Sequence, residues 1–157
     1  MIQVAVCGPA ECSAAEAVAA REVGALLACS GAVVLCGGYG GVMAAAAQGA
    51  AGAGGLVIGI LSGADRSGAS PHLTAAIATG MGQARNSVLV GSADAVIAVG
   101  GSWGTLAEVA MAVRQGVEPV VGLGSWQIAD ARGGAVPGLV VADSPAAAVA
   151  LALEGRG

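Results

Sequence analysis

The sequence predicts an α/β fold, a Rossmann-like doubly wound parallel sheet with helices on both faces, formed by residues 1–157 as a single domain. Unbroken apolar runs alternate with helical segments along the whole chain, which is typical of parallel strands buried on both sides. Glycine-rich turns follow three of these runs. Ligands of such folds bind outside the carboxyl ends of the strands, so a composite pocket is expected there.

The first half of the chain is expected to form four strands and two helices. Strands are predicted at the apolar runs 2–7, 32–35 and 56–60, with a weaker one at 73–78. The first helix opens at Ser13 and runs to about Cys29. Glu16 follows Ser13 by three residues, a spacing better explained by a capping box than by a functional site. The second helix covers 42–51, where the glycines of 52–55 stop it.

The second half is expected to continue the same alternation after a polar loop over residues 62–71. The elements predicted there are a helix at 82–90, a strand at 95–99, a helix at about 105–115, and strands at 119–123 and 138–141. Ser144 and Pro145 then start a terminal helix, with serine as the N-cap and proline at the first helical position.

The composition predicts an oligomer and argues against several classes of protein. Only 10% of the residues are charged and 56% are hydrophobic, so apolar surface is expected to be covered in a homodimer or higher homo-oligomer. The net charge is −4 and no basic patch contains aromatic residues, which argues against nucleic-acid binding. The sequence contains no lysine, which excludes a pyridoxal-phosphate Schiff base and a Walker-type P-loop.

The cysteines predict buried thiols rather than a metal site. Cys7, Cys12, Cys29 and Cys36 form no Cys-x-x-Cys pair and the chain has one His, so neither a metal nor a cofactor is expected. Cys7 and Cys36 end predicted strands, with a reactive thiol as the less favoured interpretation. We expect a reducing, cytoplasmic location. Residues 23–64 carry no charge, but glycines interrupt them, so no membrane span is expected.

The glycine-rich turns predict binding of a nucleotide or another phosphorylated small molecule. A turn between a strand and a helix exposes backbone N–H groups at the positive end of the helix dipole, which favours phosphate. The turns do not match the dinucleotide fingerprint G-x-G-x-x-G. The candidate phosphate-binding residues are Gly8, Gly37, Gly38, Gly40, Gly41, Gly100, Gly101, Ser102, Gly104 and Thr105.

Two charged residues and one aromatic residue accompany these turns, and each has two interpretations. Glu108 is either a carboxylate beside the phosphate site or the last residue of a capping box that starts at Thr105. Arg85, early in a predicted helix, is either a solvated surface residue or a fork for phosphate or carboxylate. Trp103 either lines a base pocket or packs at a subunit interface, and packing is slightly favoured.

Three segments together resemble the LOG family (the "Lonely Guy" phosphoribohydrolases) and its wider Rossmann-like relatives. Residues 36–43 are similar to the family's Gly-Gly-Gly-x-x-Gly-Leu-Met turn, residues 81–86 to its Met-x-x-Arg-Lys segment, and residues 100–108 to its Pro-Gly-Gly-x-Gly-Thr-x-x-Glu motif. The resemblance implies a dimer that hydrolyses nucleoside 5′-monophosphates, such as cytokinin riboside 5′-monophosphate or AMP, to base and ribose 5-phosphate. It implies Arg85 and Glu108 as the catalytic pair.

The departures from these motifs point to a second hypothesis. Gly100 stands in place of the family's proline, Ser102 in place of a glycine, Ala107 in place of an acid and Asn86 in place of lysine. These changes are closer to a shorter branch that includes proteins resembling molybdenum-cofactor carriers, which hold a phosphorylated pterin without cleaving it. The chain is therefore expected to be either a phosphoribohydrolase or a non-catalytic carrier or sensor of a nucleotide or pterin.

Overall fold

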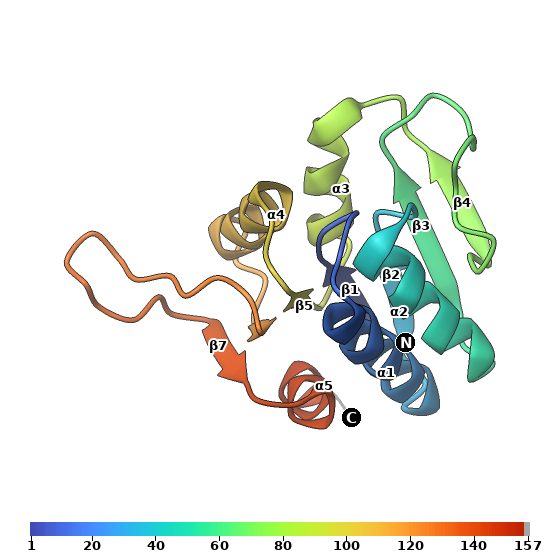
Figure 1. Ribbon diagram of the computed structural model, residues 1–157. Coiled ribbons are helices and arrows are strands. Elements are labelled where there is room, and N and C mark those ends of the chain that lie inside the picture. Colours follow the sequence, from blue (N-terminus) through green and yellow to red (C-terminus); the bar gives the residue numbers. More distant parts are fainter. Residues whose placement is uncertain (156–157) are drawn as a thin grey trace.

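The computed structural model describes residues 1–155 and confirms the predicted doubly wound α/β fold. Seven strands form one parallel sheet in the order β4-β3-β2-β1-β5-β6-β7 (Figure 1). Their bounds are β1 Gln3–Cys7, β2 Val33–Cys36, β3 Val57–Leu61, β4 Ala75–Ala78, β5 Ala95–Val99, β6 Val120–Leu123 and β7 Leu139–Ala142.

The order of the strands reverses at β1. The chain proceeds from β1 outward to β4, then crosses back to place β5 on the other side of β1. Val4 of β1 accordingly pairs with Val34 of β2 on one side and with Ala95 of β5 on the other. The carboxyl ends of β1 and β5 therefore flank the switch point, where ligands of doubly wound folds bind.

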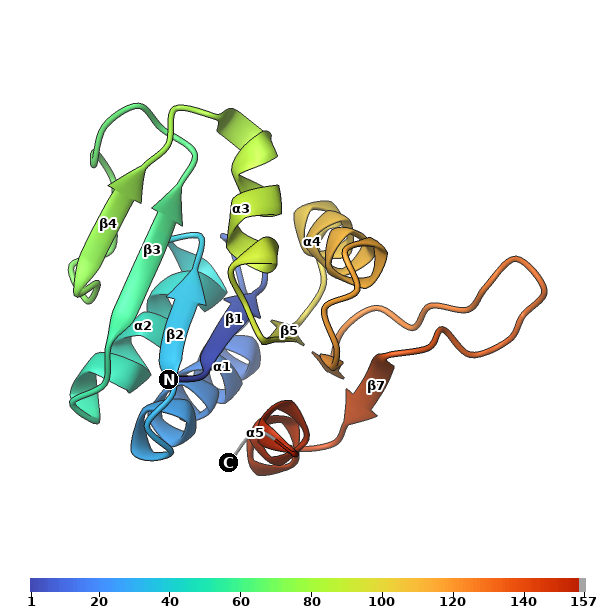
Figure 2. The ribbon, with the colours of Figure 1, turned by 180° about the vertical axis from the view of Figure 1, so that it is seen from behind.

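Helices cover both faces of the sheet. Helices α1 (Ala14–Cys29), α2 (Gly41–Gly52) and α5 (Pro145–Leu153) contribute to one core cluster, and α3 (Arg85–Gly91) and α4 (Trp103–Arg114) to the other. Figures 1 and 2 show these two layers from opposite sides of the sheet. No helix within residues 1–155 has the length and apolarity that crossing a membrane requires.

Small residues allow α1 and α2 to pack with their backbones almost in contact. A Cβ atom added at Gly24 of α1 would collide with the carbonyl oxygen of Ala46, and one added at Gly49 of α2 would collide with that of Arg21. Ala20, Ala46 and Ala50 are fully buried around this contact. The abundance of alanine and glycine thus reflects close approach of backbones in the core.

The elements differ from the sequence predictions mainly at their ends. The helix predicted at 82–90 is a 3₁₀ turn, η1 (Gly82–Ala84), followed by α3. Helix α4 begins at Trp103, two residues before its predicted start, because Ser102 is its N-cap. The capping box at the start of α1 is confirmed, since Ser13 and Glu16 each accept a hydrogen bond from the other's backbone N–H.

Candidate functional site

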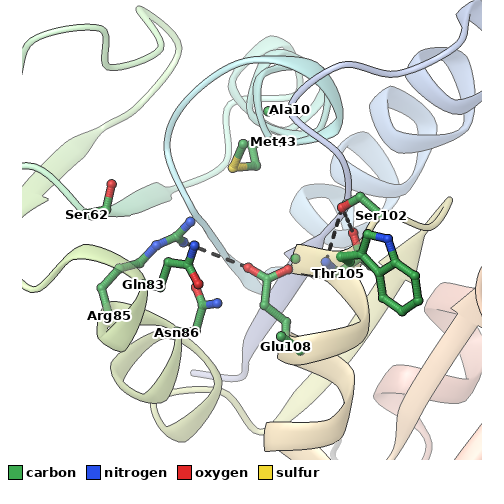
Figure 3. A pocket seen from close by; sticks show the side chains of 13 residues that line it. Ala10, Met43, Ser62, Gln83, Arg85, Asn86, Ser102, Thr105 and Glu108 are labelled. Atoms are coloured by element: carbon green, nitrogen blue, oxygen red, sulfur yellow. Dashed lines mark hydrogen bonds and ion pairs between the residues drawn. The ribbon is translucent and has the colours of Figure 1, made fainter.

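A pocket of about 380 Å³ lies at the carboxyl ends of the strands, beside the switch point (Figure 3). Its walls come from the segments that follow β1, β3 and β5, from η1, from the first turns of α2 and α3, and from the first two turns of α4. The lining residues are Gly8, Ala10, Met43, Ser62, Gln83, Arg85, Asn86, Ser102, Trp103, Gly104, Thr105, Ala107 and Glu108. The volume lies within the range of small-molecule sites.

The N-terminus of α4 forms one side of the pocket. The Ser102 hydroxyl accepts a hydrogen bond from the backbone N–H of Thr105 (3.3 Å), and the hydroxyls of Ser102 and Thr105 lie 3.0 Å apart. The indole N–H of Trp126 donates to the Ser102 carbonyl oxygen (2.9 Å), which fixes the turn from outside. Two hydroxyls at the positive end of a helix dipole are suited to hold an anion.

Glu108 lies farther along α4, and the structure rejects the capping-box interpretation for it. The N-cap of α4 is Ser102, so Glu108 is the sixth helical residue and lies beyond the capping positions. Its side chain is directed into the pocket, between Arg85 and the α4 N-terminus (Figure 3). Burial raises the pKa of the Glu108 carboxyl, while the Arg85 charge and a hydrogen bond with the Cys7 thiol oppose this effect.

Arg85 faces Glu108 from the first turn of α3. Gly80 and Gly82 donate backbone hydrogen bonds to the carbonyls of Gly63 and Ser62, which holds this segment against the end of β3. Nη1 of Arg85 lies 4.0 Å from Oε1 of Glu108, and the two side chains are 12% and 8% exposed. The solvated-surface interpretation of Arg85 is therefore wrong.

Several polar atoms of the pocket are buried without a hydrogen-bond partner among the described residues. They are Nε and Nη1 of Arg85 and Oδ1 of its neighbour Asn86. Leaving such atoms unpaired costs free energy, more so for a charged group. A ligand that pairs with them would recover this cost, so the α3 side of the pocket is a candidate binding surface.

The glycine turn of residues 37–41 supports the pocket without lining it. The backbone N–H of Val42 donates to the Pro9 carbonyl (3.0 Å), and a Cβ at Gly41 would collide with the carbonyls of Pro9 and Ala10. The start of α2 thus faces the β1–α1 loop. A Cβ at Gly37 would lie 2.5 Å from Nη1 of Arg85, so this glycine makes room for the guanidinium.

The structure brings half of the predicted site residues into one pocket. Gly8, Arg85, Ser102, Gly104, Thr105 and Glu108 line it, whereas Gly37, Gly38, Gly40, Gly41, Gly100 and Gly101 do not. A contact between any of these residues and phosphate stays a prediction. The prediction did not assign Ala10, Met43, Ser62, Gln83, Asn86 or Ala107, which also line the pocket. Usable signals existed for Met43, the last residue of the segment 36–43, and for Gln83 and Asn86, which lie in the same segment as Arg85.

The structure also shows the surroundings of Trp103 and of the buried cysteines. Trp103 lines the mouth, is 78% exposed and packs at a tilt against Trp126 with ring centroids 5.1 Å apart. Burial raises the pKa of the Cys7 thiol and raises that of Cys36 to about 11, which argues against a reactive role for either. Within residues 1–155, no three His, Cys, Asp or Glu side chains group in a way that could hold a metal ion.

Comparisons with known proteins identify relatives of this chain in sequence and fold. The model of the SLOG cluster4 family matches residues 1–149. The structure of the molybdenum cofactor binding protein from Rippkaea orientalis is 36% identical and covers 96% of this chain and 94% of that chain, with a TM-score of 0.88. The Moco carrier protein from Chlamydomonas reinhardtii is 34% identical and covers 95% and 93%, with a TM-score of 0.82.

Two further similarities are less informative about function. An uncharacterized protein from Archaeoglobus fulgidus is 43% identical over 116 residues, which are 74% of this chain and 76% of that protein. DNA processing protein A from Streptococcus pneumoniae is 20% identical, with a TM-score of 0.72 over 95% of this chain and 61% of that chain, and shows the fold alone. The predicted similarity to molybdenum-cofactor carriers is confirmed, while membership of the LOG family itself stays a prediction.

Proposed function

The chain belongs to the SLOG cluster4 family, and on that premise we propose that it is a carrier that binds a phosphorylated pterin of the molybdenum-cofactor type and releases it unchanged. The observation that carries the proposal is that Nε and Nη1 of Arg85, at the pocket beside the switch point of the sheet, have no hydrogen-bond partner, although Nη1 faces Oε1 of Glu108 at 4.0 Å. Buried donors of a charged group in this state favour a ligand with a strong hydrogen-bond acceptor.

The two sides of the pocket suit the two ends of such a ligand. Ser102 and Thr105 offer hydroxyls at the α4 N-terminus, where a phosphate monoester would be stabilised by the helix dipole. Gly104, between them, leaves the backbone accessible. Arg85 and Asn86, on the α3 side, offer polar atoms to the heterocycle. The cofactor is the cargo in this proposal, and the protein contributes binding and exclusion of water.

A nucleoside 5′-monophosphate phosphoribohydrolase is the second candidate, and the position of Glu108 favours it. The carboxyl is directed into the pocket beside Arg85 and has a raised pKa. Cleavage of an N-glycosidic bond passes through an oxocarbenium-like transition state, which a carboxylate can stabilise, or the carboxylate can activate the attacking water. We rank this candidate second because the structural relatives named above are cofactor-binding and carrier proteins.

Titration with a matched pair of pterins tests the proposed carrier function. 6-Hydroxymethylpterin monophosphate and its unphosphorylated alcohol differ only in the phosphate, and pterin fluorescence reports binding of both. The carrier predicts that the phosphorylated compound binds at least about tenfold more tightly, since charge-assisted contacts at the α4 N-terminus are lost with the alcohol. Equal affinity for the two compounds would contradict it. Release of free base from AMP or a cytokinin riboside 5′-monophosphate would instead support the hydrolase.

We also propose that the protein is a cytoplasmic homodimer or higher homo-oligomer. Large apolar side chains are exposed along the segment that runs from β4 into α3, namely Ile77, Met81 and Val88. Covering them would lower the free energy of an assembly. Light scattering coupled to size-exclusion chromatography tests this, because a monomeric mass at micromolar concentration would contradict it.

A further inference from the structure

Three polar side chains gather at the α3 side of the pocket. Arg85 and Asn86 are consecutive residues in the first turn of α3, and Glu108 approaches Arg85 from α4 (Figure 3). Asn86 and Glu108 are 9% and 6% exposed, and all three residues line the pocket. Ser102 and Thr105 lie on the opposite side of Glu108, so this cluster is separate from the α4 N-terminus.

The cluster combines one donor group and two acceptor groups in the wall of the pocket. Arg85 can only donate, and its Nε and Nη1 have no hydrogen-bond partner. Oδ1 of Asn86 is an acceptor and is also unpaired. The Glu108 carboxylate has two oxygens that can accept several hydrogen bonds, and Nη1 of Arg85 and the Cys7 thiol use only part of this capacity. A ligand that satisfies the cluster must bring one acceptor beside two donors.

We infer that Arg85, Asn86 and Glu108 recognise the 2-amino-4-oxopyrimidine edge that pterins and guanine share. That edge carries a carbonyl oxygen, a ring N–H and an exocyclic amino group in a row, which complements the donor and two acceptors of the cluster. Adenine carries an amino group beside an unprotonated ring nitrogen and lacks the carbonyl acceptor. The inference rests on the proposed function, because the phosphate of the same ligand is assigned to the α4 N-terminus.

This arrangement gives Glu108 a binding role. Its carboxylate accepts from the ligand's N–H groups, and Arg85 holds the ligand's carbonyl oxygen while compensating the buried negative charge. A polar site binds a ligand that lacks one of the matching groups much more weakly, because a buried group of the site is then left unpaired. Specificity for the ring and affinity for the phosphate therefore depend on different residues.

Three nucleotides that share ribose 5′-phosphate provide the test. GMP, IMP and AMP differ only at the base edge, since IMP lacks the amino group of GMP and AMP lacks the carbonyl. Isothermal titration should give the order GMP, IMP, AMP, with GMP at least about tenfold tighter than AMP. In Asn86→Leu and Glu108→Gln the preference for GMP should fall severalfold, while the affinity for ribose 5-phosphate should stay as in the wild type.

Two variants control for unfolding. Ser87→Ala removes an exposed hydroxyl on α3 next to Asn86, outside the pocket, and should leave the GMP-to-AMP ratio unchanged. Asn86→Asp keeps an acceptor oxygen and should retain the preference for GMP even if its melting temperature changes. Collapse of the ratio in Asn86→Asp to the level of Asn86→Leu would contradict recognition through the acceptor.

The results of these titrations distinguish failure of the proposed edge recognition from failure of the proposed carrier function. AMP binding as tightly as GMP, with both dependent on their phosphate, would overturn recognition of the edge and leave a phosphate-binding carrier. GMP and guanosine binding equally well, with adenosine excluded, would support recognition of the edge and contradict the proposed phosphate site. Absence of binding by all three nucleotides and by the phosphorylated pterin would overturn both.

Discussion

The guanidinium of Arg85 lies directly against the Cα of Gly37, so that a Cβ at this position would be 2.5 Å from Nη1. The glycine follows β2 and the arginine begins α3, two segments that are far apart in the sequence. Gly37 does not line the pocket, but this contact connects it to Arg85, which does. It also provides a direct way to move Arg85 without replacing it.

Gly37→Ala should therefore weaken ligand binding while the fold persists. The atoms nearest to the added methyl group are the ends of two flexible side chains, Arg85 and Met43, which can shift. We expect the affinity for the phosphorylated pterin to fall about tenfold or more, because displacement of a charged hydrogen-bonding group costs this much. Gly52→Ala at the end of α2, where no atom lies within 4 Å of the added Cβ, is the control. Equal affinity in the two variants would contradict a role of Arg85 in ligand binding.

Ser102→Ala should reduce both stability and phosphate affinity. The serine caps α4 through the Thr105 N–H and also lines the pocket. Loss of an N-cap costs about 1 kcal/mol in the free energy of unfolding. Ser144→Ala removes the equivalent cap of α5, away from the pocket, and should lose similar stability without any change in affinity. Denaturant unfolding and pterin titration measured on both variants separate the two roles.

The free energy of unfolding should depend on pH through Glu108. Burial raises the pKa of this carboxyl in the folded state above its value in the unfolded state. Between these two pKa values the folded chain binds more protons than the unfolded chain, so the free energy of unfolding falls as the pH rises through this range. Glu108→Gln abolishes this titration. The stability of the wild type relative to the variant should therefore be highest at a pH below the ordinary glutamate range and decrease towards neutral pH. A difference that grows with pH would show that the carboxyl is stabilised in its charged form instead.

The cysteines should differ sharply in reactivity. Cys29 is exposed and Cys12 is half-buried, whereas Cys7 and Cys36 are buried and have pKa values raised by that burial. At pH 8 iodoacetamide should label Cys29 first, and Cys7 and Cys36 only after unfolding, because the thiolate is the reactive form. Peptide mass spectrometry after timed labelling gives the order. Rapid labelling of Cys7 in the folded protein would contradict this expectation and support a reactive thiol at this position.

Local pattern was sufficient to predict the sheet, because every strand is a continuous apolar run. The fold buries the five inner strands, β1, β2, β3, β5 and β6, almost completely, whereas the edge strands β4 and β7 remain largely accessible. It was insufficient at the start of α4. The spacing from Thr105 to Glu108 imitates a capping box, and only the observed cap at Ser102 shows that Glu108 instead faces the pocket. The earlier start of α4 thus excludes a capping role for Glu108 and places its side chain at the pocket.

The rest of the pocket depended on contacts that no local pattern encodes. The glycine turn before α2 matches the turn before α4 in composition, yet the carbonyls of Pro9 and Ala10 lie against it. Asn86 was noted only as a replacement for lysine, and its importance follows from burial of Oδ1 next to Arg85. Met43 and Ser62 reach the pocket because the ends of several strands meet at one edge.

The carrier function is tested most directly by measuring the pterin and molybdenum bound to the protein purified from cells that make the cofactor. A carrier should retain both in a fixed ratio, and Arg85→Leu, which removes the buried guanidinium, should retain neither. Arg85→Lys, which keeps the charge but not the planar array of N–H donors, should retain an intermediate amount. Equal pterin and molybdenum in the wild type and in a folded Arg85→Leu variant would contradict the carrier function.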